Sequence, residues 1–253
     1  MKFEPAITPY LRPANGVAAM MRQVLFALVP AALASVWFFG IGLIANLFVC
    51  IAVCVASEAV AVHLRGRSVE DALSDYSALV TAVLLAFALP PLTPWWISAT
   101  ASVFAIGVAK HVYGGLGFNL FNPAMVGYVV VLVSFPREMS AFIPPRMGDL
   151  DYQALKLGES VWYVLSGQLP AGTSLDAITR ATPLDAVRSA LAQSQTMAEA
   201  KASPMFGDFG GRGWEWINNF IALGGAWLLY QRIIRWHIPV GVFAGLLIPA
   251  VVA

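Results

Sequence analysis

A polar stretch at residues 176–185 places a hydroxyl group where it could carry a phosphate. Thr182 stands where the N-cap of a helix belongs, Pro183 takes the first helical position with its φ angle already set, and Asp185 follows three residues after the cap. This spacing predicts a helix over Leu184–Gln193. A phosphate on the N-cap oxygen would lie against unpaired backbone N–H groups and the positive end of that helix. The plainer interpretation is a capped surface helix, and the two agree physically.

The same stretch resembles an attachment signal for flavin. Asp176, Thr179, Ala181 and Thr182 match the pattern Asp-x-x-Ser/Thr-x-Ala-Thr, at which a flavin transferase esterifies the phosphate of FMN to the last threonine. Arg180 stands where that signal usually has glycine, and an arginine there could pair with the phosphodiester charge. The resemblance implies covalent FMN on Thr182.

The composition indicates a membrane protein. Hydrophobic residues make up 59% of the chain and charged residues only 11%, far outside the range of soluble globular domains. The net charge of +1 argues against a nucleic-acid partner, which would need a basic face. No cleavable signal peptide is expected, because residues 1–22 are polar and contain proline. Cys50 and Cys54 would share one helix face as small core residues, since two thiols alone make a poor metal site.

The apolar segments predict an all-α polytopic membrane protein with about seven spanning or half-spanning helices. Some segments are shorter than the ~20 residues that cross a bilayer, which suggests half-helices lining a cavity. The segments are Val24–Phe39, Ile41–Val62, Tyr76–Leu89, Trp95–Val112, Pro123–Phe135, Trp216–Ile233 and Ile238–Ala253. The last one ends without a polar flank, so we expect the natural protein to continue beyond it.

The basic residues of the short loops predict the orientation. They precede the first span, follow the second and fourth, and separate the last two, while the alternate loops carry none. Short basic loops stay in the cytoplasm, so the amino terminus is expected inside and the long polar segment outside. We expect residues 1–135 to form an N-terminal membrane bundle, residues 136–213 a periplasmic insertion that carries Thr182, and residues 214–253 further membrane helices. The basic residues counted are Lys2, Arg12, Arg22, Arg65, Arg67, Lys110, Arg232 and Arg235.

The insertion carries eight acidic and seven basic residues and is expected to be solvated, with short helices rather than a core of its own. Besides Leu184–Gln193, helices are predicted over Tyr152–Leu157 and Trp162–Gly167, and a loop over Ser194–Gly213. The tryptophans at the span edges are interpreted as interfacial anchors. They are Trp95, Trp96, Trp214 and Trp216.

A glycine-rich break separates the fourth and fifth apolar segments. Gly114, Gly115 and Gly117 permit a tight backbone excursion, and Asn122 with Pro123 restarts a helix with a cap and a proline at its first position. The end of such a half-helix could hold an anionic or polar ligand group. A re-entrant loop that only packs against its neighbours would have the same sequence.

Isolated polar residues inside the spans need an interpretation. Glu58 is a functional candidate because a carboxylate in a membrane helix is costly, although it could instead reach His63 or Arg65 at the interface. Asn46 is expected to form an interhelical hydrogen bond. His111, like the other two histidines, His63 and His237, falls near a span end and is interpreted as an interface residue, although the three could meet in the fold.

Four motifs together resemble a known family. Residues 114–128 with Ser134-Phe135-Pro136, residues 179–185, residues 232–239 and the opening Thr8-Pro9-Tyr10-Leu11-Arg12 occur in the order found in the RnfD proteins of the bacterial Rnf electron-transport complex. The opening departs from that family's Ser-Pro-His by Thr for Ser and Tyr for His. The resemblance covers nearly the whole chain. More distantly, the chain is similar to the NqrB protein of the sodium-translocating NADH:quinone reductase.

The resemblance implies a multi-pass subunit of the bacterial inner membrane that relays electrons between ferredoxin and NAD while the complex moves Na⁺ or H⁺. The implied partners are the other Rnf proteins (RnfA, RnfB, RnfC, RnfE and RnfG), above all the exported flavin-bearing RnfG, with the lipid bilayer and, during maturation, the flavin transferase. Relatives also imply a second, non-covalent flavin such as riboflavin nearer the cytoplasm. The candidate residues for it are Gly114, Gly115, Gly117, Asn119 and Asn122.

Two other functions remain open at this stage. The half-helices and the triplet Asn122-Pro123-Ala124 would also suit a cofactor-free solute channel or transporter, although water channels carry that triplet twice. A purely structural scaffold protein of the complex is the third hypothesis.

Overall fold

The computed structural model describes residues 16–146, 155–207 and 210–252. These residues form helices joined by turns and loops, with one isolated bridge between Phe206 and Gly211 in place of any strand. The sequence motif at Thr8–Arg12 lies outside the described residues. In chain order the elements are α1 (Val17–Phe39), α2 (Gly42–Leu64), α3 (Val69–Leu73), α4 (Ser77–Ala88), α5 (Trp95–Val103), the π-helix η1 (Phe104–Val112), α6 (Pro123–Ser134), α7 (Pro136–Met139), α8 (Leu157–Ser166), α9 (Leu175–Ile178), α10 (Pro183–Ala192), α11 (Met197–Lys201), α12 (Trp214–Tyr230) and α13 (His237–Val252).

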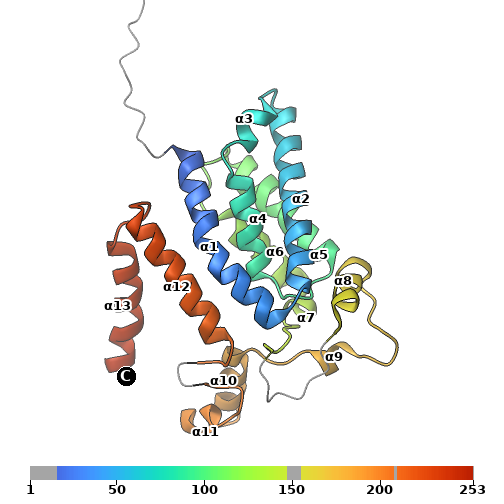
Figure 1. The fold of residues 1–253 in the computed structure, drawn as a ribbon, viewed down its shortest axis with the longest axis vertical. Helices are drawn as coiled ribbons and strands as arrows, with labels where there is room; N and C mark the ends of the chain where they lie inside the picture. Colours follow the sequence, from blue (N-terminus) through green and yellow to red (C-terminus); the bar gives the residue numbers. More distant parts are fainter. Residues whose placement is uncertain (1–15, 147–154, 208–209, 253) are drawn as a thin grey trace, which may run out of the picture.

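The core lies where α2, α4, α5, η1 and α6 pack around one another (Figure 1). Small side chains line these contacts, and Gly127 of α6 lies so close to α5 that an added Cβ would come within 2.4 Å of the Ala101 carbonyl oxygen. Such close backbone approach is typical of membrane helices. Lipid removes the hydrophobic driving force between them, and small residues allow close van der Waals packing instead. Among the described residues, two helices, α1 and α2, are each 23 residues long and apolar enough to cross a membrane.

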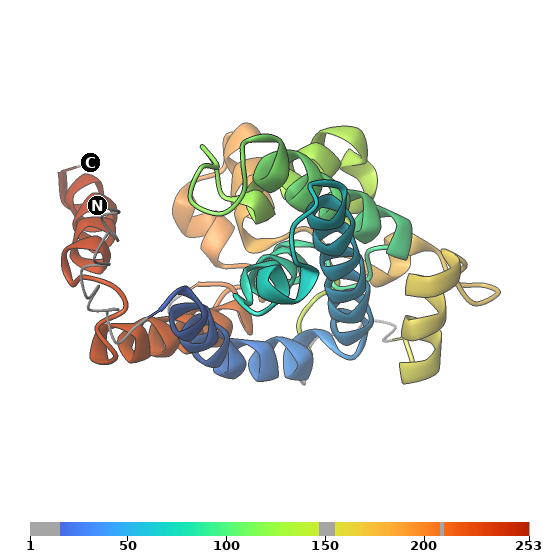
Figure 2. The same ribbon diagram turned by 90° about the horizontal axis from the view of Figure 1, so that it is seen from above.

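A second packing unit joins α1 to α12. Gly224 of α12 lies against α1, where an added Cβ would stand 2.1 Å from the Ala27 carbonyl oxygen. At the far end of this pair, Phe39 packs against the ring of Trp214 with 4.7 Å between centroids. Helix α13 follows α12 at the edge of the molecule, away from the core (Figures 1 and 2).

A buried break between α4 and α5 is held by α2. Residues 89–94 are buried although they are not helical, so their carbonyl groups need partners inside the protein. Asn46 supplies them, because its Nδ2 donates to the carbonyl oxygens of Pro90 at 3.4 Å and Pro91 at 3.0 Å, while its Oδ1 accepts from Ser98 Oγ at 2.8 Å. The expected role of Asn46 as an interhelical hydrogen-bond partner is confirmed.

The short fifth segment begins as the sequence predicts. Asn122 caps α6 by accepting a hydrogen bond from the Ala124 N–H at 3.0 Å, and Pro123 is the first helical residue. The fourth segment differs, because it is α-helical only to Val103 and continues as the π-helix η1. The expected core position of Cys50 and Cys54 is confirmed, since both thiols are free and fully buried.

The insertion holds more helix than expected. Helix α10 matches the predicted Leu184–Gln193 closely, but α8 begins at Leu157, five residues before the predicted start at Trp162. The predicted helix Tyr152–Leu157 is wrong at its described end, where residues 155–156 are not helical, and its earlier part lies outside the described residues. The loop predicted over Ser194–Gly213 is also wrong, because α11 forms there behind a reciprocal cap between Thr196 and Glu199.

The helices of the insertion gather at one end of the bundle. In Figure 1, α9, α10 and α11 lie at the end opposite α3 and the start of α1. The helix α8 lies beside α2 at the edge seen in Figure 2. The proposed division into residues 1–135, 136–213 and 214–253, and which end faces the periplasm, stay predictions.

Candidate functional site

Thr182 is the N-cap of α10. Its Oγ1 accepts a hydrogen bond from the Asp185 N–H at 3.3 Å and donates one to Asp185 Oδ2 at 2.7 Å, while Pro183 is the first helical residue. Asp185 lies in the first helical turn, where its negative charge interacts favourably with the positive end of the helix dipole. The cap predicted from the sequence is therefore confirmed, and the hydroxyl lies half-buried at the tip of the helix.

The residues before Thr182 form one short turn of helix followed by an extended link. Asp176 is exposed in the first turn of α9, and Thr179 ends that helix with its Oγ1 donating to the Leu175 carbonyl at 2.9 Å. The N–H of Arg180 donates to the Phe142 carbonyl at 2.8 Å, which fixes the link, and Ala181 is exposed beside the threonine. Asp176 and Ala181 are thus exposed at the surface, whereas Thr179 is half-buried.

Two cavities meet at Thr182. The first has a volume of about 210 Å³ and carries two guanidinium groups, Arg180 and Arg212, beside the threonine. The second has a volume of about 600 Å³ and reaches back to the membrane bundle. It is lined by aromatic and apolar side chains from α4, α6 and α12 with those of the insertion: Phe87, Ala88, Tyr128, Leu132, Met139, Phe142 and Trp214 among others.

Trp214 lines both cavities, which sequence reasoning missed. The sequence suggested an interfacial anchor, yet its ring packs between Phe39 at 4.7 Å and Phe142 at 5.8 Å. Gly211 also contributes, because an added Cβ there would lie 2.2 Å from Pro183 Cγ. The glycine thus lets the chain that precedes α12 lie directly against the start of α10.

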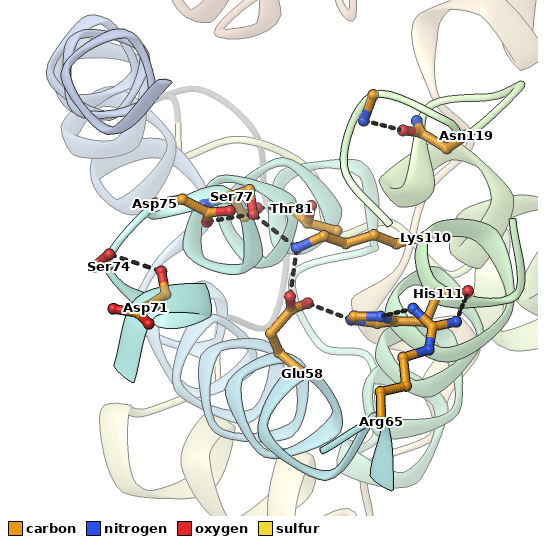
Figure 3. Close-up of polar contacts among 11 residues, drawn as sticks. Glu58, Arg65, Asp71, Ser74, Asp75, Ser77, Thr81, Lys110, His111 and Asn119 are labelled. Carbon is orange, nitrogen blue, oxygen red and sulfur yellow. Dashed lines mark hydrogen bonds and ion pairs between the residues drawn. The ribbon is translucent and has the colours of Figure 1, made fainter. Parts of the chain in front are cut away.

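A second polar cluster lies inside the bundle, beside the cavity that α3 lines (Figure 3). Glu58 of α2 is 2% exposed and its Oε1 lies 2.8 Å from Nζ of Lys110, which is also 2% exposed. The Oε2 of Glu58 lies 3.0 Å from Nε2 of the buried His111. Figure 3 shows both side chains of η1 turned toward the glutamate.

The prediction that Glu58 reaches His63 or Arg65 is wrong. The glutamate points into the bundle toward η1 rather than out along its own helix, and His63 is exposed. The interpretation of His111 as an interface residue is wrong for the same reason. Lys110, counted among the loop cations, is a buried partner of the carboxylate instead.

Arg65 fixes the orientation of the His111 ring. Its guanidinium donates to Nδ1 of His111 at 3.1 Å and to the His111 carbonyl. Because an arginine can only donate, Nδ1 must accept and the ring hydrogen belongs on Nε2, which faces Glu58. Neither Oε2 nor Nε2 has a hydrogen bond of good geometry among the described residues, although the two atoms lie 3.0 Å apart.

The cluster extends from Lys110 to Asp75. Lys110 Nζ donates to Ser77 Oγ at 2.7 Å, and Ser77 Oγ donates to Asp75 Oδ1 at 2.5 Å. A cavity of about 340 Å³ opens beside these groups. Its ionisable side chains come from α2, α3, η1 and the turns beside them: Glu58, Arg67, Asp71, Asp75, Lys110 and His111.

The glycine-rich break forms one wall of that cavity. Gly114, Gly115 and Gly117 have φ angles of +110°, +106° and +90°, which L side chains rarely adopt, so the loop needs glycine at all three. Gly114 and Gly115 line the cavity, whereas Gly117 and the two asparagines predicted with them do not. Those asparagines hold backbone instead: Asn119 accepts from the Gly117 N–H at 3.3 Å, and Asn122 caps α6.

Comparison with known proteins identifies the family. The model of the NQR2, RnfD, RnfE family matches residues 5–253. The chain belongs to this family. Curated relatives, each named as the D subunit of an ion-translocating oxidoreductase complex, come from Vibrio cholerae serotype O1, 46% identical with all of this chain and 74% of the relative aligned, and from Alcanivorax borkumensis, 43% identical with 100% and 71% aligned. One from Aeromonas hydrophila is 40% identical, with 98% of this chain and 72% of the relative aligned.

Membership of the NQR2, RnfD, RnfE family confirms the resemblance read from the four motifs and the expected fold class, an all-α membrane protein. Both polar sites described above lie within the matched residues. The FMN attachment and the second flavin stay predictions.

Proposed function

We propose that this chain is a membrane subunit of an Rnf-type ion-translocating oxidoreductase complex and carries FMN as a phosphoester on Thr182. The observation that carries the proposal is the position of Thr182 Oγ1, at the electropositive tip of α10 and at the junction of two cavities. The names of the relatives support the complex. Because those names describe an oxidoreductase complex, they support an electron carrier better than a cofactor-free channel.

The residues around Thr182 suit both halves of FMN. The smaller cavity would take the phosphodiester, because Arg180 and Arg212 supply cationic donors and the N–H of Asp185 points at the threonine oxygen. The ester bond would replace the hydroxyl proton that Asp185 now accepts. Arg180, the departure from the flavin-transferase signal, thus gains a role as counter-ion.

The larger cavity would take the flavin ring. Its aromatic walls, Phe87, Tyr128 and Trp214, offer flat apolar surface for stacking, and its position against α4 and α6 would hold the ring next to the membrane bundle. Bound there, FMN would supply one- and two-electron redox chemistry, while the protein provides tethering, orientation and electrostatics. Within the complex, electrons would arrive from the exported flavin-bearing protein, coupled to movement of Na⁺ or H⁺.

The experiment compares Thr182→Ala with Thr196→Ala in a host that also makes the flavin transferase. Thr196 is a matched control, because it caps α11 in the same way but lines neither cavity at Thr182. After denaturing electrophoresis, ultraviolet light should show a fluorescent band for the wild type and Thr196→Ala and none for Thr182→Ala. A dark wild-type band, or a fluorescent Thr182→Ala band, would reject attachment at this residue.

A further inference from the structure

Glu58 and Lys110 form an ion pair that the electron relay at Thr182 does not use. The pair faces the cavity of about 340 Å³ that α3 also lines, and α3 lies at the opposite end of the bundle from α10 (Figure 1). We infer that Glu58 is a proton-accepting station for the ion movement of the complex, loaded from this cavity through Asp75, Ser77 and Lys110. The inference rests on the proposed function and names residues of its ion path.

The hydrogen-bonded chain supplies the route. Asp75 is half-buried at the cavity wall, whereas Ser77, Lys110 and Glu58 are buried. Consecutive heavy atoms lie 2.5 Å, 2.7 Å and 2.8 Å apart from Asp75 to Glu58, so every step is within hydrogen-bonding distance (Figure 3). An ammonium group cannot accept a proton, so Lys110 first gives one of its protons to Glu58. The neutral amine then takes the proton of the Ser77 hydroxyl, and Asp75 supplies the serine with a new one.

The charges facing Glu58 make the loaded state short-lived. On loading, a proton from cavity water enters the chain at Asp75, the Glu58 carboxylate becomes a carboxylic acid, Lys110 ends as an ammonium again and the cluster gains one positive charge. Lys110 then loses its nearby counter-charge. Release of the same proton restores the pair, so no other reactant is consumed.

The geometry favours a proton over a metal cation. A hard cation takes several oxygen ligands, but Oε1 of Glu58 already holds an ammonium group and Oε2 faces a ring nitrogen. Asp71 and Asp75 line the cavity beside the fixed charge of Arg67. Among the described residues, no group of three or more His, Cys, Asp or Glu side chains could hold a metal ion.

The placement of Lys110 on a π-helix supports a functional role. Wide π turns are rare and frequently mark functional sites. Here the π-helix ends at Val112, and its last turn directs two successive side chains, Lys110 and His111, toward one glutamate. The distortion is therefore located where the pair forms.

The test uses the whole complex in vesicles, with Glu58→Gln, Lys110→Met and the double variant. Glu70→Gln is the matched control, because Glu70 is an exposed glutamate of α3 and does not line the cavity. Protons moved per electron transferred should fall about tenfold or more in Glu58→Gln, because the accepting group is gone, and remain at the wild-type value in Glu70→Gln. The double variant removes both charges and should recover the yield of folded protein without recovering proton movement.

Recovery of proton movement in the double variant would show that the pair is only structural and would overturn the inference. Loss of ²²Na⁺ uptake with unchanged proton movement in Glu58→Gln would overturn it as well. A second readout does not depend on transport: infrared difference spectra on addition of the electron donor should contain a carboxylic acid band that disappears in Glu58→Gln but not in Glu70→Gln. If the wild-type vesicles move no ion, the proposed function fails, and this band alone decides the inference.

Discussion

Nζ of Lys110 lies 2.8 Å from Oε1 of Glu58, and the two residues are 52 positions apart in the sequence. The pair joins α2 to η1 across the core. Both side chains are almost fully shielded from solvent, so each charge depends on the other for its stability.

Removal of one charge should therefore destabilise the protein more than removal of both. Lys110→Met should lower the free energy of unfolding by about 3–5 kcal/mol, because it leaves a buried carboxylate without its cation. The free energy of unfolding of the double variant, which also carries Glu58→Gln, should be much closer to the wild-type value. Unfolding in mixed detergent micelles measures the difference, and equal losses in the single and double variants would contradict the pairing.

Two adjacent glycines of α12 should respond in opposite ways. Gly224→Ala should lower the free energy of unfolding by about 1–3 kcal/mol, since its Cβ would meet the Ala27 carbonyl oxygen at 2.1 Å and push α12 away from α1. Gly225→Ala has nothing within 4 Å of its added Cβ and should stabilise the helix by up to about 1 kcal/mol. In thermal unfolding, the midpoint temperature of Gly224→Ala should lie below that of the wild type, and the midpoint temperature of Gly225→Ala above it.

Asn46→Leu should weaken the buried break between α4 and α5. The Pro90 carbonyl keeps its hydrogen bonds from Thr93, but the Pro91 carbonyl loses the Asn46 donor. An unsatisfied buried carbonyl costs about 1–3 kcal/mol. Hydrogen exchange should report faster opening at the start of α5, and unchanged exchange there would argue against the role of Asn46.

Helix α11 should loosen in acid. The backbone N–H of Thr196 donates to Glu199 at 2.7 Å and its hydroxyl at 2.9 Å, and these bonds lower the pKa of the exposed glutamate. A lowered folded pKa gives stability that is present above the ordinary glutamate value of about 4.3 and is lost as pH falls through the folded value. Amide protection of residues 197–201 should fall over that range in the wild type and stay flat in Glu199→Gln.

The parts of this structure that the sequence predicted are those governed by local rules. Thr182 with Pro183, and Asn122 with Pro123, were recognised as helix starts because a cap and a first-position proline act over a few residues. The same kind of rule was available for α11, where Thr196-Met-Ala-Glu199 is a capping box, and the prediction of a loop there overlooked it.

The parts that the sequence did not predict depend on how distant segments pack. Glu58 pairs with Lys110 because α2 crosses η1 and because the π-helical turns direct Lys110 into the bundle. Neither the crossing nor the π-helix produces a recognisable pattern in the local sequence. From the sequence, Trp214 is interpreted as an interfacial anchor. Its ring contacts with Phe39 and Phe142 join segments that are distant in the sequence, so no local pattern predicts them. The second flavin stays a prediction, as does covalent FMN.

The close fit of Gly224 against Ala27 joins the first helix to one that follows the whole insertion. The α1–α12 contact therefore holds together the two ends of the part of the chain that separates these helices. A chain cut within the insertion and made as two separate polypeptides should still reassemble into one folded protein, since the α1–α12 contact, rather than the continuity of the backbone, brings the two fragments together.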